Sequence, residues 1–354
     1  MIREDKDLAF MLQYENVSWY ENGQVRILDR RIYPREVKFV TCVHHKEVAQ
    51  AITDMVTQSA GPFAAAGMGM ALAAYEARNM NSKDIWEYLN DAAYTLSTAR
   101  PTTTKRMKII VNGCLGAANI AIKDGVKVDE AIFNHTLSTI NNRYKKMGKV
   151  ADYLVDMFPQ KGTIMTQCFG ETIVGLMLRE TKKRGKDIKV ICPETRPYFQ
   201  GARLTASVAF DQGFDVTVIT DNMPAYVMQN KNIDLFTSAA DAICMDGYIV
   251  NKVGTFQIAI VAKYLGIPYF VTGIPDRGHD TVSTIKIEER DSDFVLQAMG
   301  VKTAMDGVKG YYPSFDITPP HLVSGVVTDK GIFSPYDLNR YYQDNSDERE
   351  ELIV

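Results

Sequence analysis

The sequence lacks the features that mark several large classes of protein. Its five cysteines are scattered along 354 residues without a CxxC pair, which argues against a disulfide framework and gives no spacing suited to zinc. No apolar run approaches the length of a membrane-spanning helix, and the charged N-terminus does not resemble a signal peptide. The formal net charge of −3 gives no reason to expect nucleic acid or an anionic membrane as a partner. We therefore expect a cytoplasmic protein with reduced thiols.

The chain also lacks the patterns that bind common cofactors. No G-x-G-x-x-G follows a strand-like run, so nothing indicates a dinucleotide site. Gly67 and Gly69 lie in an almost wholly apolar segment without a preceding strand, and we interpret them as a close contact between helices instead of a phosphate loop. No group of candidate ligands has the spacing of a metal site. The sequence therefore predicts neither a metal nor an organic cofactor.

What the chain does contain is ordinary for a globular enzyme of two domains. Apolar residues make up 46% and charged residues 23%, and the length exceeds the ~250–300 residues at which single cores stop growing. Residues 17–43 alternate apolar and polar side chains around an Asn22-Gly23 turn signal, and helical periods follow. We predict a small β-ribbon and helical domain over residues 1–155 and a Rossmann-like catalytic domain over residues 156–354.

The second half of the chain alternates strand-like and helix-like segments. Its strand-like runs are apolar on both faces and are joined by helical segments, which is typical of a parallel sheet covered by helices. The predicted fold class is therefore α/β. The expected strands are residues 164–168, 188–192, 216–219, 239–245 and 269–271, with a late strand at 326–333.

Polar residues gather where these strands are expected to end. Cys168 ends one strand, Asp241 lies in another, and the polar turn 193–205 separates a strand from a helix. Asn251 and Lys252 are expected at a helix N-terminus, where backbone N–H groups favour an anion. Because binding residues of open α/β sheets lie at the carboxyl ends of the strands, we expect these side chains to converge at one edge.

Each of these residues also has a purely structural explanation. A lone cysteine is usually a buried structural thiol, although a helix beginning just after Cys168 would favour its thiolate. An aspartate such as Asp241 is commonly a cap or turn residue, but desolvation in so apolar a stretch would raise its pKa and suit it to general acid catalysis. Glu194 and Arg196 are interpreted as an ion pair that braces the turn.

Together these segments resemble the signatures of methylthioribose-1-phosphate isomerases. That superfamily also contains ribose-1,5-bisphosphate isomerases and the regulatory subunits of initiation factor 2B. The resemblance extends along the whole chain, and such a linked set of motifs is more specific than any single one. It is carried by residues 18–23, 100–102, 166–168, 194–205, 240–241, 251–255, 287–291 and 315–320.

The resemblance implies roles for individual residues. Cys168 and Asp241 match the catalytic cysteine and aspartate of the family. Gln58 stands where relatives carry an arginine that binds the substrate, which is the clearest departure from the family pattern. We keep Gln58 as a candidate substrate-binding residue. Four further positions match residues that hold the substrate's phosphate and hydroxyl groups: Arg100, Gln200, Asn251 and Lys252.

The implied activity is that of an aldose–ketose isomerase, an intramolecular oxidoreductase that converts a ribose-type sugar 1-phosphate to the ribulose 1-phosphate. A phosphate on C1 blocks spontaneous ring opening, so Asp241 would protonate the ring oxygen. Cys168 would act as the base at carbon, or would position C2 if the hydrogen moves as hydride. No cation occurs in residues 58–62, so a small uncharged group is expected at C5, as in 5-methylthioribose or 5-deoxyribose 1-phosphate.

The resemblance also sets the expected context and the alternatives. Relatives form homodimers through the C-terminal half, and we expect the same here. Salvage of methionine or of 5-deoxyribose is the expected pathway. The first alternative is a ribose-1,5-bisphosphate isomerase. The second is a non-catalytic regulatory protein, like the initiation factor subunits, with a pocket for a sugar phosphate or a nucleotide.

Overall fold

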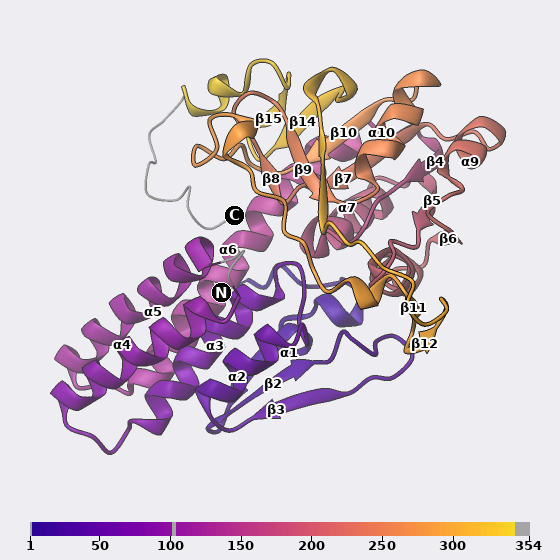
Figure 1. Cartoon of the computed structure of the whole chain (residues 1–354). Coiled ribbons are helices and arrows are strands. Elements are labelled where there is room, and N and C mark those ends of the chain that lie inside the picture. Colours follow the sequence, from indigo (N-terminus) through magenta and orange to yellow (C-terminus); the bar gives the residue numbers. More distant parts are fainter. Residues whose placement is uncertain (1, 101–103, 344–354) are drawn as a thin grey trace. The chain divides into compact units, whose positions relative to one another are not determined.

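The computed structural model describes residues 2–100 and 104–343, which belong to two compact units (Figure 1). We call residues 1–145 the N-terminal unit and residues 146–346 the C-terminal unit. The division falls inside a single long helix, α6 (Val128–Asp156). None of the helices in the described part of the chain has the length and apolar character needed to cross a membrane.

The N-terminal unit begins with short helical turns and an antiparallel ribbon. Two turns, η1 (Phe10–Leu12) and α1 (Tyr14–Val17), precede strands β1 (Ser18–Glu21), β2 (Gln24–Leu28) and β3 (Phe39–Cys42), paired in that order. Asn22 and Gly23 have φ angles of 50° and 77°, the left-handed values that a two-residue hairpin turn requires. The predicted ribbon and its turn are confirmed.

The described residues of the N-terminal unit form five further helices, of which α3 (Gly61–Glu76) is buried on almost all of its faces. They are α2 (His45–Thr53), α3 (Gly61–Glu76), α4 (Ser82–Thr98), α5 (Thr104–Asp124) and the first part of α6. Two glycines of α3 lie against neighbouring helices: a Cβ on Gly67 would come within 2.5 Å of the Thr136 side chain, and one on Gly69 within 3.0 Å of Leu96. The predicted close helix contact is therefore confirmed.

The C-terminal unit is built on a seven-stranded sheet of order β15-β14-β10-β7-β4-β5-β6. All neighbouring pairs are parallel except β14 with β15. The chain moves outward from β4 in one direction through β5 to β6, and in the other from β7 through β10 to β14. Because crossovers between parallel strands are right-handed, the helices of the two halves cover opposite faces. The predicted helix-covered parallel sheet is confirmed.

The strands of this sheet are β4 (Lys161–Met165), β5 (Asp187–Pro193), β6 (Asp215–Ile219), β7 (Leu235–Ala239), β10 (Tyr269–Thr272), β14 (Gly325–Thr328) and β15 (Gly331–Phe333). The helices between them are α7 (Glu171–Lys183), α8 (Ala206–Asp211), α9 (Pro224–Asn230) and α10 (Thr255–Tyr264). A second, antiparallel sheet has the order β13-β9-β8, with β8 (Ala242–Ile243), β9 (Ile249–Lys252) and β13 (Phe315–Thr318). A hairpin of β11 (Gln297–Ala298) and β12 (Val301–Lys302) lies between β9 and β13 in sequence. Four single helical turns also occur: η4 (Val282–Thr284), η5 (Ser292–Phe294), η6 (Pro320–Leu322) and η7 (Leu338–Tyr342).

Two predicted strands are wrong in position. The strand expected at 239–245 is β7, which ends at Ala239, and the residues after it turn into β8 of the second sheet. The polar residues Thr237 and Ser238 interrupt the apolar run, so the sequence did not predict a strand there. Both residues are nevertheless buried, and the Ser238 hydroxyl lies 2.7 Å from that of Tyr269. The late strand expected at 326–333 is a hairpin, β14 and β15.

Candidate active site

The order of the strands places the site at the centre of the C-terminal unit's sheet. Strands β4 and β7 are neighbours, and the chain runs away from them in opposite directions. Loops that follow two such strands diverge, and ligands of open α/β sheets bind in the crevice between them. Cys168 follows β4 and Asp241 follows β7. The point at which the strand order reverses is called the switch point of the sheet. The thiol and the carboxylate predicted from the sequence therefore lie on its two loops.

Cys168 occupies a strained turn between β4 and α7. Its φ angle is 58°, in the left-handed region that non-glycine residues rarely adopt and that clusters at functional sites. The hydroxyl of Thr205 donates a hydrogen bond to the Cys168 carbonyl, which fixes this turn against the polar segment 193–205. The residue is partly buried, whereas the other four cysteines are fully buried. Among the five cysteines, all of which the structure describes, Cys168 is thus the least buried residue.

The surroundings of Cys168 favour the thiol over the thiolate. Its pKa is raised to about 11, mainly by burial and to a smaller extent by the charge of Asp241, although the positive charges of Lys252 and Arg290 lower it. The backbone N–H of Phe169 also lowers the pKa, as a helix start should, but this effect is smaller than that of burial. The helix start thus acts in the expected direction, towards the thiolate, but burial outweighs it.

Asp241 lies in the short turn between β7 and β8. Its backbone N–H donates to the carbonyl of Val250 at 2.8 Å, which attaches the turn to β9. The residue is exposed, so the desolvation expected from its apolar neighbours in sequence is wrong. The flanking alanines Ala240 and Ala242 are only half-buried, and the turn leaves the aspartate between them exposed. Asp241 and Cys168 thus lie on the loops that follow the neighbouring strands β7 and β4.

Asn251 and Lys252 end strand β9 instead of beginning a helix. Both are buried, with exposed fractions of 5% and 4%, and the Asn251 amide donates to the Thr255 hydroxyl at 3.0 Å. Helix α10 begins at Thr255, three residues after Lys252. Lys252 therefore stands at a strand end and not at the predicted helix N-terminus. The side-chain amide of Gln167, next to Cys168, donates to the carbonyl of Val253 at 3.3 Å, which joins the two segments.

The N-terminus of α10 already holds a carboxylate. Asp316 accepts hydrogen bonds from the backbone N–H groups of Gly254 at 2.6 Å and Phe256 at 3.2 Å. The anion that the sequence predicts for this helix start is therefore a side chain of the protein itself. Burial raises the pKa of Asp316 to about 6, although these two N–H groups and the charge of Lys252 lower it.

The polar segment 193–205 is tightly folded around Gln200. Gln200 is 7% exposed, and its side-chain oxygen has no hydrogen-bond partner among the residues that the structure describes. Gly201 begins a π-helical turn, Gly201–Thr205, where a Cβ would lie 1.8 Å from the carbonyl oxygen of Pro193. The buried, unpartnered amide oxygen suits Gln200 to a hydroxyl-bearing ligand.

Arg196 has a different role from the one expected. Its guanidinium donates to the carbonyl oxygens of Val295 at 3.1 Å and Gln297 at 2.8 Å, and not to Glu194. The carboxylate of Asp221 accepts from the backbone N–H of Arg196 at 2.6 Å. The predicted bracing ion pair with Glu194 is therefore wrong, since Arg196 ties the segment to the distant chain around residue 296.

Arg290 and the aromatic residues around it had no role assigned from the sequence. The Arg290 guanidinium carbon lies 5.9 Å from the ring centroid of Tyr198 and 5.8 Å from that of Phe315, and the Lys252 amine lies 4.7 Å from the Phe315 ring. Arg290 stands in the segment 287–291 that carries part of the family resemblance, but only the folded chain shows its place next to Tyr312 and Lys252.

The two other predicted substrate-binding residues belong to the N-terminal unit. Gln58 is buried, its carbonyl accepts from Arg30 at 2.8 Å, and its amide oxygen has no partner among the described residues. Arg100 follows helix α4 and is partly buried, with its carbonyl accepting from the Thr104 hydroxyl at 3.1 Å. Residues 101 and 102 of the Arg100 motif lie outside the described residues.

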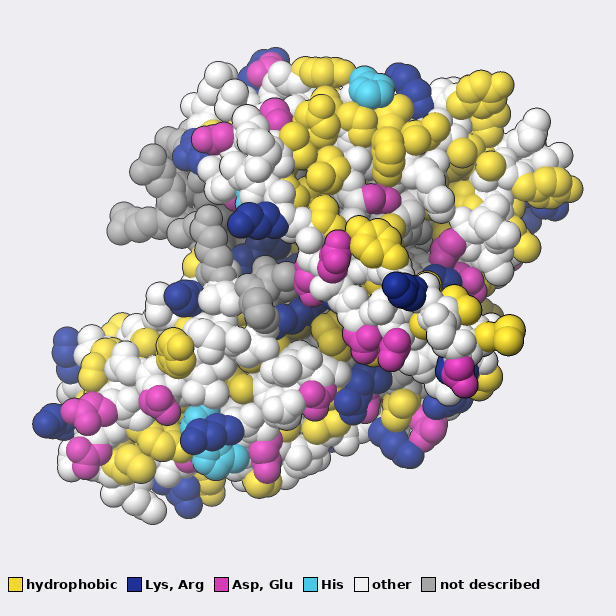
Figure 2. Space-filling model, viewed as in Figure 1, with side chains coloured by type: hydrophobic (Ala, Val, Ile, Leu, Met, Phe, Trp, Pro, Cys, Tyr) yellow, Lys and Arg dark blue, Asp and Glu magenta, His cyan; other side chains and the backbone are white. Residues whose placement is uncertain are grey.

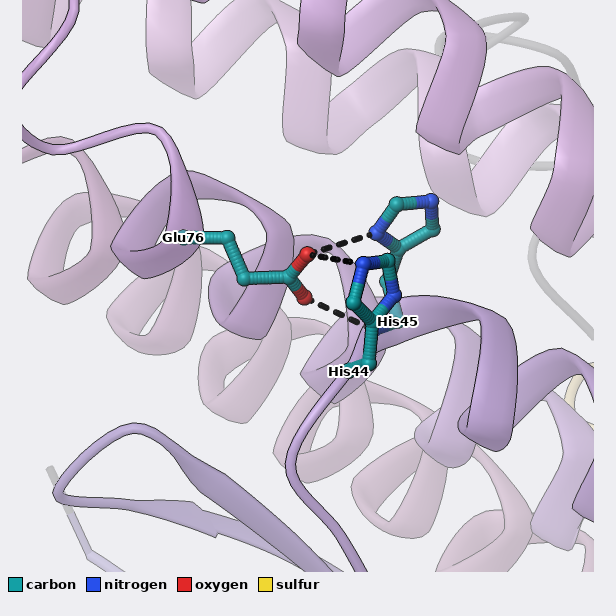
Figure 3. A group of neighbouring side chains, drawn as sticks. All are labelled: His44, His45 and Glu76. Atoms are coloured by element: carbon teal, nitrogen blue, oxygen red, sulfur yellow. Dashed lines mark hydrogen bonds and ion pairs between the residues drawn. The ribbon is translucent and has the colours of Figure 1, made fainter.

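One group of side chains in the described part of the chain has the composition of a metal site (Figure 3): His44, His45 and Glu76. The nearest ring nitrogens of His44 and His45 lie 3.2 Å and 3.1 Å from one Glu76 oxygen. The other nitrogen of His44 accepts the backbone N–H of Lys46, so a neutral ring carries its proton on the nitrogen that faces Glu76. That nitrogen is then a donor and has no lone pair for a metal.

Glu76 is instead the common acceptor of a hydrogen-bonded cluster. The backbone N–H of His45 and the hydroxyl of Tyr88 also donate to it, at 2.7 Å and 2.6 Å. Burial alone would raise the pKa of Glu76, but the bonds from His45 and Tyr88 outweigh burial and lower it. We interpret the cluster as a link between the start of α2 and the end of α3, and we assign no metal to it.

The fold and the site define a Rossmann-like α/β protein in which a thiol and a carboxylate lie on the two loops at the switch point of the sheet, with a buried lysine at the end of strand β9. Residues 57–335 match the initiation factor 2 subunit family, and the chain belongs to that family. It is 34% identical to methylthioribose-1-phosphate isomerase 1 of Pseudothermotoga lettingae over 90% of this chain and 94% of that protein. Relatives of this name are aldose–ketose isomerases, which the chain matches along nearly its whole length.

Solved structures of both branches of the family resemble the chain. The 5-methylthioribose 1-phosphate isomerase of Pyrococcus horikoshii has a TM-score of 0.83 at 28% identity, covering 95% of this chain and 99% of that one. Subunit delta of the translation initiation factor eIF-2B from A. fulgidus has a TM-score of 0.78 at 29% identity, covering 90% and 96%. The fold is therefore shared by isomerases and initiation factor subunits.

Proposed function

We propose that the protein isomerises a ribose-type sugar 1-phosphate, 5-methylthioribose 1-phosphate or 5-deoxyribose 1-phosphate, to the corresponding ribulose 1-phosphate. The proposal is supported by one arrangement: the loops of Cys168 and Asp241 follow neighbouring strands, and both are hydrogen-bonded to the chain around Lys252, Gln167 to the Val253 carbonyl at 3.3 Å and Asp241 to the Val250 carbonyl at 2.8 Å. A binding protein has no need of a thiol and a carboxylate at the same position, whereas an isomerase must move a hydrogen and protonate an oxygen. The reaction requires neither oxidant nor reductant, since one carbon is oxidised as its neighbour is reduced.

The chemistry follows from the position of the phosphate. With C1 phosphorylated, the ring opens only if the bond between C1 and the ring oxygen breaks, and that oxygen must gain a proton. Asp241 supplies the proton in this proposal. The hydrogen on C2 then moves to C1, and the C2 hydroxyl loses its proton to become the ketone. General acid catalysis of such a step contributes about 10²–10⁴-fold.

We assign Cys168 to positioning C2 while the hydrogen moves as hydride. A thiol whose pKa is raised to about 11 is protonated near neutrality and is a poor base there. A hydride that moves directly between adjacent carbons needs no base at C2. It needs only a side chain that contacts the substrate, excludes water and holds the two carbons in the geometry for transfer. The raised pKa of Cys168 supports this route over the alternative in which the thiolate removes the hydrogen as a proton.

The group at C5 is proposed to be small and uncharged. Residues 58–62 contain no cation, and the neighbouring Arg30 guanidinium is fully buried and already donates to the Gln58 carbonyl at 2.8 Å. A second phosphate bound there without a cationic partner would be costly. The two cations of the 273–280 loop have other partners, since Arg277 lies 3.8 Å from the ring centroid of Tyr342 and His279 bonds to Thr284. An apolar methyl or methylthio group would instead gain ~0.8 kcal/mol per buried carbon.

The test is an activity assay with substrates deuterated at C2. We compare kcat/KM for 5-methylthioribose 1-phosphate, 5-deoxyribose 1-phosphate and ribose 1,5-bisphosphate, and follow the label by mass spectrometry. We expect turnover of the first two substrates, with the deuterium retained at C1. A preference for the bisphosphate would refute the argument from residues 58–62, and loss of the label to solvent would restore Cys168 as the base.

Two observations support the regulatory alternative. The chain resembles an initiation factor subunit almost as well as an isomerase in fold, and Gln58 replaces the family arginine. A protein of that second kind would bind a sugar phosphate or a nucleotide without converting it. Binding of 5-methylthioribose 1-phosphate by calorimetry without turnover, at any pH from 6 to 9, would establish this alternative.

We also propose a cytoplasmic homodimer that acts in the salvage of methionine or of 5-deoxyribose. Exposed apolar side chains gather over α9 and α10 (Figure 2), with Phe256, Ile260 and Tyr264 spaced four residues apart along one face of α10 and Tyr226 on α9. Patches of this kind on a folded protein are often interfaces. The replacement Ile260→Asp should shift the molar mass measured by light scattering from dimer to monomer, and an unchanged mass would move the interface elsewhere.

A further inference from the structure

Two side-chain amides of the C-terminal unit have buried oxygens that find no hydrogen-bond partner among the described residues. One is Gln200, which the family resemblance already connects with the substrate. The other is Gln167, the residue directly before Cys168, which is 4% exposed. An amide oxygen can only accept a hydrogen bond, and burying it without a donor is unfavourable. Gln167 therefore needs a donor that the described part of the chain does not supply.

The orientation of the Gln167 amide is fixed by its nitrogen. The side-chain N–H donates to the main-chain carbonyl of Val253 at 3.3 Å. Because a carbonyl can only accept, the nitrogen and not the oxygen must face Val253. Turning the amide over would break this bond and would bring two acceptor oxygens together. The unpartnered atom is therefore the oxygen, on the branch of the amide that does not contact Val253.

The main chain around Gln167 is held on both sides at the end of β4. Before it, the N–H of Thr166 donates to the carbonyl of Ile191 at 3.0 Å, and after it the Thr205 hydroxyl donates to the Cys168 carbonyl. This turn is one of the two loops at the switch point of the sheet, where ligands of open α/β folds bind. The buried acceptor is thus presented by a fixed turn at the place where a ligand is expected.

The donor that suits this oxygen is a hydroxyl group and not a phosphate. A phosphate carries mainly acceptor oxygens near neutral pH and cannot satisfy an amide oxygen, whereas each hydroxyl of a sugar is a donor. We propose that the side-chain oxygen of Gln167 accepts a hydrogen bond from the C3 hydroxyl of the sugar phosphate, which makes Gln167 a specificity-determining residue.

The choice of C3 rests on the proposed function, in which Cys168 holds C2. The hydroxyl on C2 loses its hydrogen when it becomes the ketone, and would leave the Gln167 oxygen buried and unpaired in the product. The hydroxyl on C3 keeps its hydrogen throughout the reaction. It is also only one bond further along the sugar from the carbon that Cys168 positions.

A purely structural role for Gln167 predicts a different result. Its bond to Val253 joins the Cys168 turn to the end of β9, and this link could be its whole role, with a water molecule bonded to the oxygen. Replacing Gln167 would then weaken the binding of every ligand by the same factor. If the oxygen accepts from the C3 hydroxyl, replacement weakens only the ligands that carry this hydroxyl. The coupling between residue and hydroxyl therefore distinguishes the two roles.

The experiment is a thermodynamic cycle between one side chain and one hydroxyl. The Asp241→Asn variant, in which turnover is suppressed, is the parent protein. Calorimetry gives the Kd of 5-deoxyribose 1-phosphate and of 3,5-dideoxyribose 1-phosphate for the parent and for Gln167→Met, which is similar in size but has no amide. Gln257→Met is the matched control, because the exposed Gln257 amide also donates to a main-chain carbonyl, that of Asp221 at 3.1 Å.

We expect loss of the C3 hydroxyl to raise the Kd of the parent about tenfold or more, because the Gln167 oxygen is left buried and unpaired. This ratio should fall at least about threefold in Gln167→Met and stay unchanged in Gln257→Met. If Gln167→Met does not fold, as judged by its melting temperature, Gln167→Asn takes its place, since the shorter side chain withdraws the oxygen. A ratio in the Gln167 variant equal to that of the parent, or a parent that binds both sugars equally, overturns the proposal.

The cycle separates this inference from the proposed function. Calorimetry needs no turnover, so a wild-type protein that isomerises no sugar 1-phosphate, while its variants show the coupling, would refute only the function. Turnover by the wild type without coupling at Gln167 would refute only the inference. Failure of the parent to bind either sugar phosphate would overturn both.

Discussion

The ionisation of Cys168 decides between the two routes for the hydrogen, and it can be measured directly. Burial of the thiol raises its pKa from the ordinary 9.0 to about 11. The thiolate fraction at pH 8 then falls from about one in ten to about one in a thousand. Alkylation requires the thiolate, so the rate of reaction with iodoacetamide should rise about tenfold for each pH unit from 7 to 10 without levelling off.

The assay follows carboxamidomethylation of the Cys168 peptide by mass spectrometry at pH 7, 8, 9 and 10. The Cys168→Ser variant gives the background from the four buried cysteines. Two further variants test the causes of the shift. Asp241→Asn removes a charge that raises the thiol's pKa, and should speed alkylation at pH 8, whereas Lys252→Met removes a charge that lowers it, and should slow alkylation.

A plateau in the rate below about pH 9 would refute this reasoning, because it would show a thiol that ionises as easily as an exposed one. The base mechanism would then regain its support, and burial would no longer be the dominant influence on this residue. Effects of Asp241→Asn and Lys252→Met in the reverse directions would show that the two charges do not face the sulfur as the structure has them.

Three other predictions concern chemistry, binding and stability. Asp241→Asn removes the general acid and should lower kcat about 10²–10⁴-fold. Cys168→Ser should lower kcat about 10²-fold, because the smaller side chain holds C2 less closely. The circular dichroism spectrum should be unchanged in both, and a variant that keeps more than about a tenth of wild-type kcat contradicts its assigned role. Arg100→Lys should raise KM severalfold, since lysine cannot reproduce a two-point contact with phosphate; an unchanged KM moves that contact elsewhere. Burial raises the pKa of Asp316 from 3.8 to about 6, so its protonated form stabilises the fold below pH 4, and this contribution is lost as the pH rises through 6. Asp316→Asn should therefore increase the unfolding free energy by up to about 3 kcal/mol at pH 8 and by much less at pH 4, and an equal effect at both pH values contradicts the argument.

Much of the fold could be read from apolar periodicity because the parallel strands are buried on both faces. The segments at β4, β5, β6 and β10 were found within a few residues for this reason. Strand β7 was misplaced because Thr237 and Ser238 break the apolar run, and only the contact of Ser238 with Tyr269 shows why polar residues are accommodated there. Sequence periodicity carries no information on such cross-strand hydrogen bonds.

The candidate site was predictable where it follows strand ends and unpredictable where it depends on long-range pairing. Cys168 and Asp241 could be placed together because both follow strands of one parallel sheet. The exposure of Asp241 could not be foreseen, since it depends on how a turn is directed and not on which residues flank it. Arg290 lies beside Lys252 only because its segment pairs with the chain before β13, a register that no local pattern in the sequence reveals.

The hydrogen bond from Thr205 to the carbonyl of Cys168 has a consequence for how this protein can evolve. Gln200 precedes and Thr205 ends a π-helical turn that packs directly on Pro193, because a Cβ at Gly201 would lie 1.8 Å from the Pro193 carbonyl oxygen. The segment expected to recognise the sugar and the turn that carries the thiol therefore move as one piece. A substitution that reshapes recognition at Gln200 would also displace Cys168, so we expect new substrates to be acquired through residues elsewhere in the site, while this segment changes little among descendants of the chain.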